Sequence, residues 1–106
     1  MRWEFEGEMW LYEGRDPWHF ITLPLEMSEA IRDDTAGSHR GFGSVRVLAA
    51  IGNTTWSTSV FPDKASGAFQ LPVKAAVREA EDLMAGDIVT VRIDVAERSQ
   101  HVDPGS

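Results

Sequence analysis

The sequence predicts a mainly β protein, a small closed barrel of six strands with two short helices. Two observations favour this fold: period-two alternation in several segments, and an internal duplication. Residues 20–24 and 69–72 are two versions of one apolar strand that ends in Leu-Pro. Each is followed by a helix-like segment with an arginine, and then by a glycine that leads into a second strand, at residues 43–47 and 86–91. A duplicated strand–helix–strand unit can close one barrel within a single chain.

Alternation of apolar and polar residues predicts where the strands lie. In residues 3–12 one side is apolar, and the other side carries Glu4, Glu6 and Glu8 before two aromatic residues. Turn residues at 13–17 and 52–53 indicate two hairpins. The other five strands are expected at residues 18–23, 45–51, 54–61, 68–71 and 88–95.

Two helices are expected between these strands. Residues 25–32 follow Pro24, which suits a helix start, and place acidic residues near the positive end of the helix dipole. Residues 72–84 carry apolar side chains at helical spacing and form the stronger helix. Residues 33–43 are rich in helix- and strand-breaking residues and are predicted to form a mobile loop.

Length and composition exclude several classes of protein. A chain of 106 residues makes one domain, here residues 1–96, followed by a flexible tail at residues 97–106. The absence of cysteine excludes disulfides, thiolate zinc sites and thiol nucleophiles. No apolar stretch approaches the roughly 20 residues that span a bilayer, and the N-terminus lacks a secretory signal. We therefore expect a bacterial-type cytoplasmic protein without membrane contact.

The net charge of −7 is unevenly distributed. Residues 1–34 hold nine acids and three bases, and residues 79–106 hold seven acids and two bases. Residues 35–78 hold one acid and five bases, a balance of +4. An acidic chain argues against unspecific nucleic-acid binding. The basic middle leaves room for a local anion site, although its attraction to the acidic parts of the same chain is the favoured interpretation.

The last third of the chain resembles a known motif. The Leu-Pro of residues 71–72, Arg78 and the Gly-Asp of residues 86–87 resemble the swapped hairpin of AbrB/MazE-type transcription factors. In those proteins two chains build one double-split barrel. The duplication here implies that both halves lie in one chain.

The whole chain is still more similar to the bacterial domain-of-unknown-function family numbered 1905. The similarity covers roughly residues 3–95 in the right order. It implies a double-split type of β-barrel and no settled activity. The segments that carry it are residues 18–20, 23–24, 43–47, 51–62, 71–74, Arg78 and 86–87.

Three charged residues share one face of the stronger predicted helix: Lys74, Arg78 and Asp82, spaced at i, i+4 and i+8. Lys74 lies at the positive end of the helix dipole, a placement that costs about 0.3–1 kcal/mol if exposed. A bound anion held by Lys74 and Arg78 would offset that cost. A salt bridge from Lys74 to the acidic N-terminal strand would offset it equally, and this second interpretation is favoured.

A second candidate site is the hydroxyl-rich segment at residues 54–59. Trp56 and Thr58 share one strand face, and Arg46 of the neighbouring strand is expected to approach them. Inside a barrel, this group could bind a small polar ligand. The favoured alternative is that β-branched hydroxyl residues simply suit strands.

No catalytic motif stands out in the sequence. His19, His39 and His101 lack the spacing of metal ligands, and no serine lies in a Gly-x-Ser-x-Gly elbow. Residues 41–43 lack the Gly-Lys-Ser/Thr of a phosphate loop. We therefore expect no cofactor and no metal, and the sequence favours a protein without catalytic activity.

These observations predict a non-catalytic binding or interaction module, a monomer or weak homodimer, whose partner is a small anionic ligand or a protein. The alternative is a transcription-regulator-like module that acts through nucleic acid or a partner protein, with nucleic acid disfavoured by the charge. The predicted ligand-binding residues are Arg46, Trp56, Thr58, Lys74 and Arg78.

Overall fold

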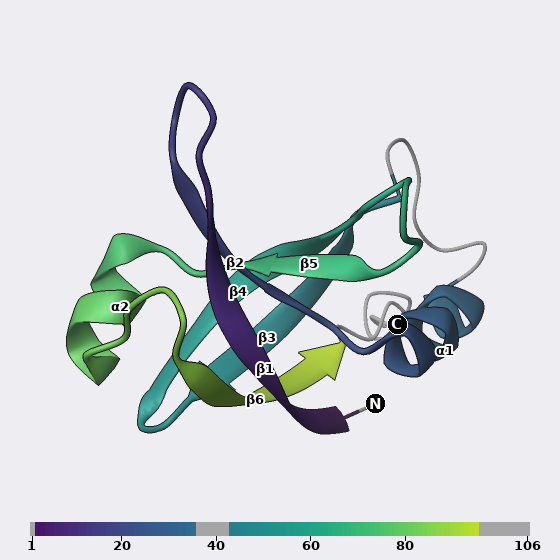
Figure 1. Cartoon of the computed structure of the whole chain (residues 1–106). Helices are drawn as coiled ribbons and strands as arrows, with labels where there is room; N and C mark the ends of the chain where they lie inside the picture. The colour runs from purple at the N-terminus through teal and green to yellow at the C-terminus, as the bar shows by residue number, and fades with distance from the viewer. Residues whose placement is uncertain (1, 36–42, 96–106) are drawn as a thin grey trace.

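The computed structural model describes residues 2–35 and 43–95, and it confirms the mainly β fold (Figure 1). Six antiparallel strands close a barrel in the order β1-β2-β5-β4-β3-β6. The elements in chain order are β1 (Arg2–Tyr12), β2 (Trp18–Thr22), α1 (Leu25–Thr35), β3 (Val45–Ile51), β4 (Thr54–Pro62), β5 (Phe69–Pro72), α2 (Ala75–Glu81) and β6 (Ile88–Val95).

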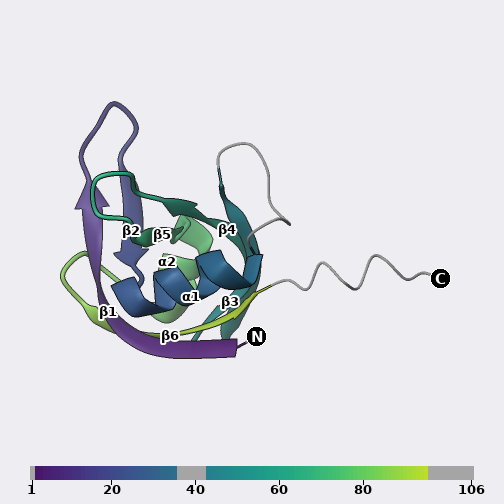
Figure 2. The same cartoon turned by 90° about the vertical axis from the view of Figure 1, so that its right-hand side faces the viewer.

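The core fills the inside of the barrel. Period-two alternation turns every second side chain inward, so that Val45, Val47 and Ala49 of β3 are buried while the residues between them face outward. The two helices lie at opposite ends of the barrel (Figure 1), and Figure 2 shows α1 lying across one mouth. Ile31 of α1 and Val77 of α2 are fully buried there. Each such side chain contributes roughly 1.5–3 kcal/mol by leaving water.

The duplication is visible as an approximate two-fold relation between the halves β1-β2-α1-β3 and β4-β5-α2-β6. Strands β2 and β5 pair with each other across this axis, where Ile21 faces Leu71. One backbone hydrogen bond runs from the N–H of Leu23 to the carbonyl of Phe69, and its counterpart runs from the N–H of Val73 to the carbonyl of His19. Both N···O distances are 2.9 Å. The internal repeat is therefore a property of the fold.

The structure corrects how the two halves align. The repeated Leu-Pro motif equates Leu23 with Leu71, whereas the paired hydrogen bonds make Leu23 equivalent to Val73. Pro24 precedes α1, while Pro72 belongs to strand β5. The predicted helix start at Pro72 was therefore wrong, because the hydrogen-bonded register of β5 holds Pro72 opposite Phe20.

Both helix lengths also differ from the prediction. Residues 33–35, predicted as loop, are the last residues of α1. Helix α2 stops three residues before the predicted end at residue 84, because Asp82 takes a left-handed conformation with φ 56° and caps the helix. Aspartate tolerates this conformation better than most residues do. The remainder of the predicted loop (residues 36–42) and the predicted tail (residues 97–106) lie outside the described residues.

Candidate functional site

Two of the predicted binding residues face the barrel interior. Trp56 is only 7% exposed and belongs to the hydrophobic core, and Thr58 lies on the same inward face of β4. This confirms the predicted orientation of the strand. Trp56 packs in that core, and its buried indole N–H has no hydrogen-bond partner among the described residues, so that ligand binding by Trp56 stays a prediction.

Arg46 lies on the other side of the barrel wall, so the predicted approach of Arg46 to Trp56 was wrong. Its guanidinium group donates hydrogen bonds to the hydroxyl oxygens of Ser59 (3.2 Å) and Ser57 (2.9 Å) on the outer face of β4. The physical reason is the pleat: Arg46 stands between Val45 and Val47, whose side chains point inward. Arg46 and Trp56 therefore cannot bind the same ligand.

Lys74 and Arg78 both belong to the α2 end of the barrel. Lys74 is the exposed residue that precedes α2, and it makes no ion pair with any residue that the structure describes. The favoured salt bridge from Lys74 to the acidic N-terminal strand was therefore wrong, because the side chain stays in solvent at the α2 end. The Nε of Arg78 donates to the carbonyl of Val73 at 3.1 Å. No ion pair joins Arg78 to Asp82 within the described ranges. Anion binding by Lys74 and Arg78 stays a prediction.

His19 is a titratable group at this end of the barrel. Burial lowers its pKa below the ordinary value, and the nearby charge of Arg78 lowers it further. Its Nδ1 atom is buried and has no hydrogen-bond partner among the described residues. The folded protein therefore favours the neutral form of His19.

An aromatic groove with a volume of about 450 Å³ lies on the outside of the barrel. Tyr12 and Trp18 expose 53% of their surface and Phe61 exposes 45%, which is unusual for aromatic side chains. The residues that line this aromatic groove are Tyr12, Trp18, Phe20, Phe61, Pro62, Asp63 and Gln70.

Strand pairing explains why these rings meet. Tyr12 of β1 lies directly opposite Trp18 of β2, and Phe61 of β4 lies opposite Gln70 of β5. Because Trp18 and Phe20 are two positions apart on one strand, both point outward. Their rings stack with centroids 6.1 Å apart and an interplanar angle of 13°. The two rings form a flat ledge on the outer face of the barrel.

A chain of hydrogen bonds links the strands beside this ledge. The indole N–H of Trp10 donates to the hydroxyl of Thr22 at 3.0 Å, and that hydroxyl donates to Oε1 of Gln70 at 2.7 Å. The Trp10 ring also packs against Phe20, with centroids 5.3 Å apart. These contacts join β1, β2 and β5 and restrict the rotamers of the side chains around the groove.

One ionised group lines the aromatic groove. Oδ2 of Asp63 accepts hydrogen bonds from the hydroxyl of Ser66 at 2.7 Å and from its backbone N–H at 3.2 Å. The Ser66 hydroxyl is the main cause that lowers the pKa of Asp63; burial opposes it, and backbone N–H groups of Ser66 and Ala65 lower the pKa further. Asp63 is therefore a carboxylate held at the edge of four aromatic rings.

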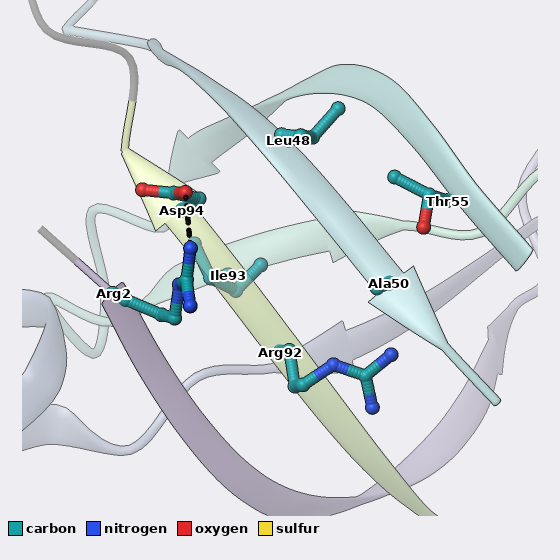
Figure 3. Close-up of a pocket in the computed structure, with 7 residues that line it drawn as sticks. All are labelled: Arg2, Leu48, Ala50, Thr55, Arg92, Ile93 and Asp94. Atoms are coloured by element: carbon teal, nitrogen blue, oxygen red, sulfur yellow. Dashed lines mark ion pairs between the residues drawn. The ribbon is translucent and has the colours of Figure 1, made fainter. Parts of the chain in front are cut away.

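A second, smaller pocket of about 180 Å³ lies on the outer face of β3 and β6 (Figure 3). Arg2 forms an ion pair with Asp94 at 3.5 Å, and both side chains lie together in Figure 3. Arg92 extends the other way and donates to the carbonyl of Gly52 at 3.1 Å. Both arginines of this pocket already bind acceptors of the protein itself.

The aromatic groove was not predicted from the sequence. One sequence pattern does indicate it, because Trp10 and Tyr12 follow Glu4, Glu6 and Glu8 on the outward side of β1. Two large aromatic residues on a face that is otherwise acidic cannot be explained by the core. The contributions of Trp18 and Phe61 depend on strand pairing.

The fold and the groove together define a class of protein: a single-chain, pseudo-symmetric six-stranded β-barrel with an aromatic outer surface. Residues 5–93 match the family model described as "Domain of unknown function (DUF1905)", and the chain belongs to this family. No curated protein matches the chain. The resemblance to AbrB/MazE-type proteins stays a prediction.

No helix in the part of the chain that the structure describes is long and apolar enough to cross a membrane. Across residues 2–35 and 43–95, no group of three or more His, Asp or Glu side chains could hold a metal ion.

Proposed function

We propose that this protein is a non-catalytic binding module whose aromatic groove holds a small organic ligand. The observation that carries the proposal is the meeting of four aromatic side chains, Tyr12, Trp18, Phe20 and Phe61, on the outside of the barrel. Binding sites for small molecules are concave, mostly apolar and about 300–1,000 Å³ in volume. Contiguous exposed apolar surface on a soluble domain marks a binding site more often than chance.

The chemistry of the lining supports binding. Its titratable groups are the phenol of Tyr12 and the carboxylate of Asp63. A general base needs a pKa near the working pH, whereas the Ser66 hydrogen bonds lower the pKa of Asp63. Asp63 is therefore suited to orient or attract a ligand and poorly suited to remove a proton from it.

The distribution of positive charge argues for this groove over the predicted anion site. Arg46 lies on the outer face of β3, while Lys74 and Arg78 lie at the α2 end. Within residues 2–35 and 43–95, no lysine or arginine lines the aromatic groove. The alternative of a nucleic-acid-binding regulator requires phosphate contacts, which this groove does not offer and which the net charge of −7 opposes.

The test is a small-molecule fragment screen followed by ¹H–¹⁵N and aromatic NMR, with resonances assigned by substitution. We expect bound fragments to shift the indole N–H of Trp18 and the ring resonances of Phe61. The variant Phe61→Ser, which removes a half-exposed side chain from the groove wall, should lower the affinity for these fragments about tenfold or more. Met84→Ser, which removes an equally apolar and 68% exposed side chain elsewhere, should leave binding unchanged.

Fragments that bind Phe61→Ser as tightly as the natural chain would contradict the proposal. Turnover of a bound compound, lost in the same variant, would show instead that the groove is an active site.

A further inference from the structure

The aromatic groove has a composition that favours one charge of ligand. Among the described residues, its lining holds four aromatic rings, one carboxylate and no basic side chain. The face of an aromatic ring carries partial negative charge, so it attracts cations and repels anions. The rings and Asp63 therefore act in the same direction.

The geometry also favours one kind of cation. Tyr12, Trp18 and Phe61 come from three different strands; each lines the groove and exposes about half of its surface. A ligand placed among them touches several rings at once, but it must give up water to do so. A compact primary ammonium group is strongly hydrated and resists this, whereas an alkylated ammonium spreads its charge over methyl groups that pack against rings.

The position of Asp63 is fixed by the turn between β4 and β5. Its N–H donates to the carbonyl of Ala68 at 2.9 Å, and its carbonyl accepts from the N–H of Gly67 at 2.7 Å. With Ser66 bound to Oδ2, the carboxylate is held in place before any ligand arrives. The net charge of −7 adds a long-range attraction for cations.

From these observations we propose that the aromatic groove binds a small free organic cation with a quaternary or trimethylated ammonium group. The methyl groups lie against Trp18, Phe20 and Phe61, and Asp63 balances the charge at the rim. This inference rests on the proposed function, because it names the ligand class of the same groove.

The experiment compares two ligands of equal shape and different charge. Choline is titrated into the whole protein and followed by NMR at constant ionic strength, alongside 3,3-dimethyl-1-butanol, in which a neutral carbon replaces the quaternary nitrogen. We expect choline to shift the Trp18 and Phe61 ring resonances and to bind about tenfold more tightly than the alcohol. Sodium chloride in place of choline should cause no such shifts.

Two variants with the same change of charge locate the effect. Asp63→Asn should lower the affinity for choline about 3–10-fold and leave the affinity for the alcohol unchanged. The turn should stay intact, since the amide oxygen can still accept the Ser66 hydrogen bond. Asp16→Asn, in the exposed loop between β1 and β2, removes the same charge outside the groove lining and should change choline binding less than about twofold.

The outcomes separate the two proposals. Equal affinity for choline and the alcohol, both lost in Phe61→Ser, would overturn the cation inference and leave the binding groove standing. If neither choline, nor the alcohol, nor any fragment shifts the groove resonances, both the cation inference and the proposed binding function would be overturned. Binding of a trimethyllysine peptide without binding of choline would overturn the assignment to a free cation.

Discussion

At the scale of single residues, Ser28 shows how one polar atom connects the two halves of the molecule. Within the described residues, Ser28 is the one polar side chain that is buried, with no exposed surface. Its hydroxyl oxygen accepts the backbone N–H of Phe69 at 2.9 Å. Helix α1 of the first half thereby satisfies a buried donor of β5 in the second half.

We expect Ser28→Ala to lower the free energy of unfolding by about 1–3 kcal/mol, because the N–H of Phe69 is then buried without an acceptor. Urea denaturation followed by circular dichroism measures this change. Ser44→Ala makes the same substitution at a partly exposed position and should cost less than about 0.5 kcal/mol. Equal midpoints for the two variants would show that the hydrogen bond does not matter.

At the scale of secondary structure elements, a carboxylate holds α2 against the β3–β4 hairpin. Glu81 accepts hydrogen bonds from the hydroxyl of Thr54 at 2.6 Å and from the N–H of Asn53 at 3.2 Å. The same side chain packs against Gly52, whose positive φ of 57° favours glycine. The C-terminal end of α2 is therefore positioned by side-chain contacts to a turn distant in sequence.

We expect Glu81→Ala to lower the free energy of unfolding by about 1–2 kcal/mol through loss of these charge-assisted hydrogen bonds. Glu79→Ala is the matched control, since it makes the same substitution in the same helix at an exposed position. It should change stability by less than about 0.5 kcal/mol. Thermal denaturation of both variants decides the matter, and a destabilisation in Glu79→Ala of the same size would refute this role of Glu81.

The charge of Arg78 in α2 acts on His19 in β2 and predicts a pH dependence of stability. Burial first, and the charge of Arg78 second, lower the pKa of His19 in the folded protein below its ordinary value of 6.5. The unfolded chain therefore binds a proton at His19 at a higher pH than the folded chain does. It follows that the stability contributed by neutral His19 is fully present above pH 6.5 and decreases as the pH falls below it.

We expect the free energy of unfolding to decrease between pH 7.5 and pH 5.5, and His19→Gln to reduce that slope. Arg78→Met should also reduce the slope, because it removes the second cause that lowers the pKa of His19. Denaturant titrations at several pH values measure the effect. A slope that is unchanged in both variants would assign the pH dependence to other groups.

At the scale of the whole molecule, the two halves depend on each other. In the part of the chain that the structure describes, only the pairs β1–β2 and β4–β5 lie within one half, whereas β1–β6, β2–β5, β3–β4 and β3–β6 join different halves. A separated half would leave β3 or β6 without any partner strand, and it would expose the side chains of the core. The molecule should consequently fold as one cooperative unit.

We expect residues 1–52 and residues 53–106, expressed separately, to lack stable structure, and to form the barrel when mixed. Circular dichroism and tryptophan fluorescence of the separate and mixed fragments measure this. For the whole chain, both probes should report one coincident transition in denaturant. Two separate transitions would mean that each half has its own stable core.

The six strands, the two helices and the internal duplication could all be predicted from the amino-acid sequence. These features are local, because side-chain alternation and turn residues reflect the conformation of each segment. The outward orientation of Arg46 could also have been predicted from the sequence, because Arg46 lies between two valines that face the barrel interior. The predicted contact between Arg46 and Trp56 was wrong because the pleat of the two strands places Arg46 on the outer face and Trp56 on the inner face of the barrel wall.

The register between the two halves and the set of residues that line the aromatic groove could not be predicted from the sequence and depend on the tertiary structure. The Leu-Pro repeat suggested one alignment, and the hydrogen bonds between β2 and β5 imposed another. Tyr12, Trp18 and Phe61 become neighbours because β1, β2, β5 and β4 are adjacent in the barrel. Strand order and register depend on packing across the whole core, which no short segment of sequence records.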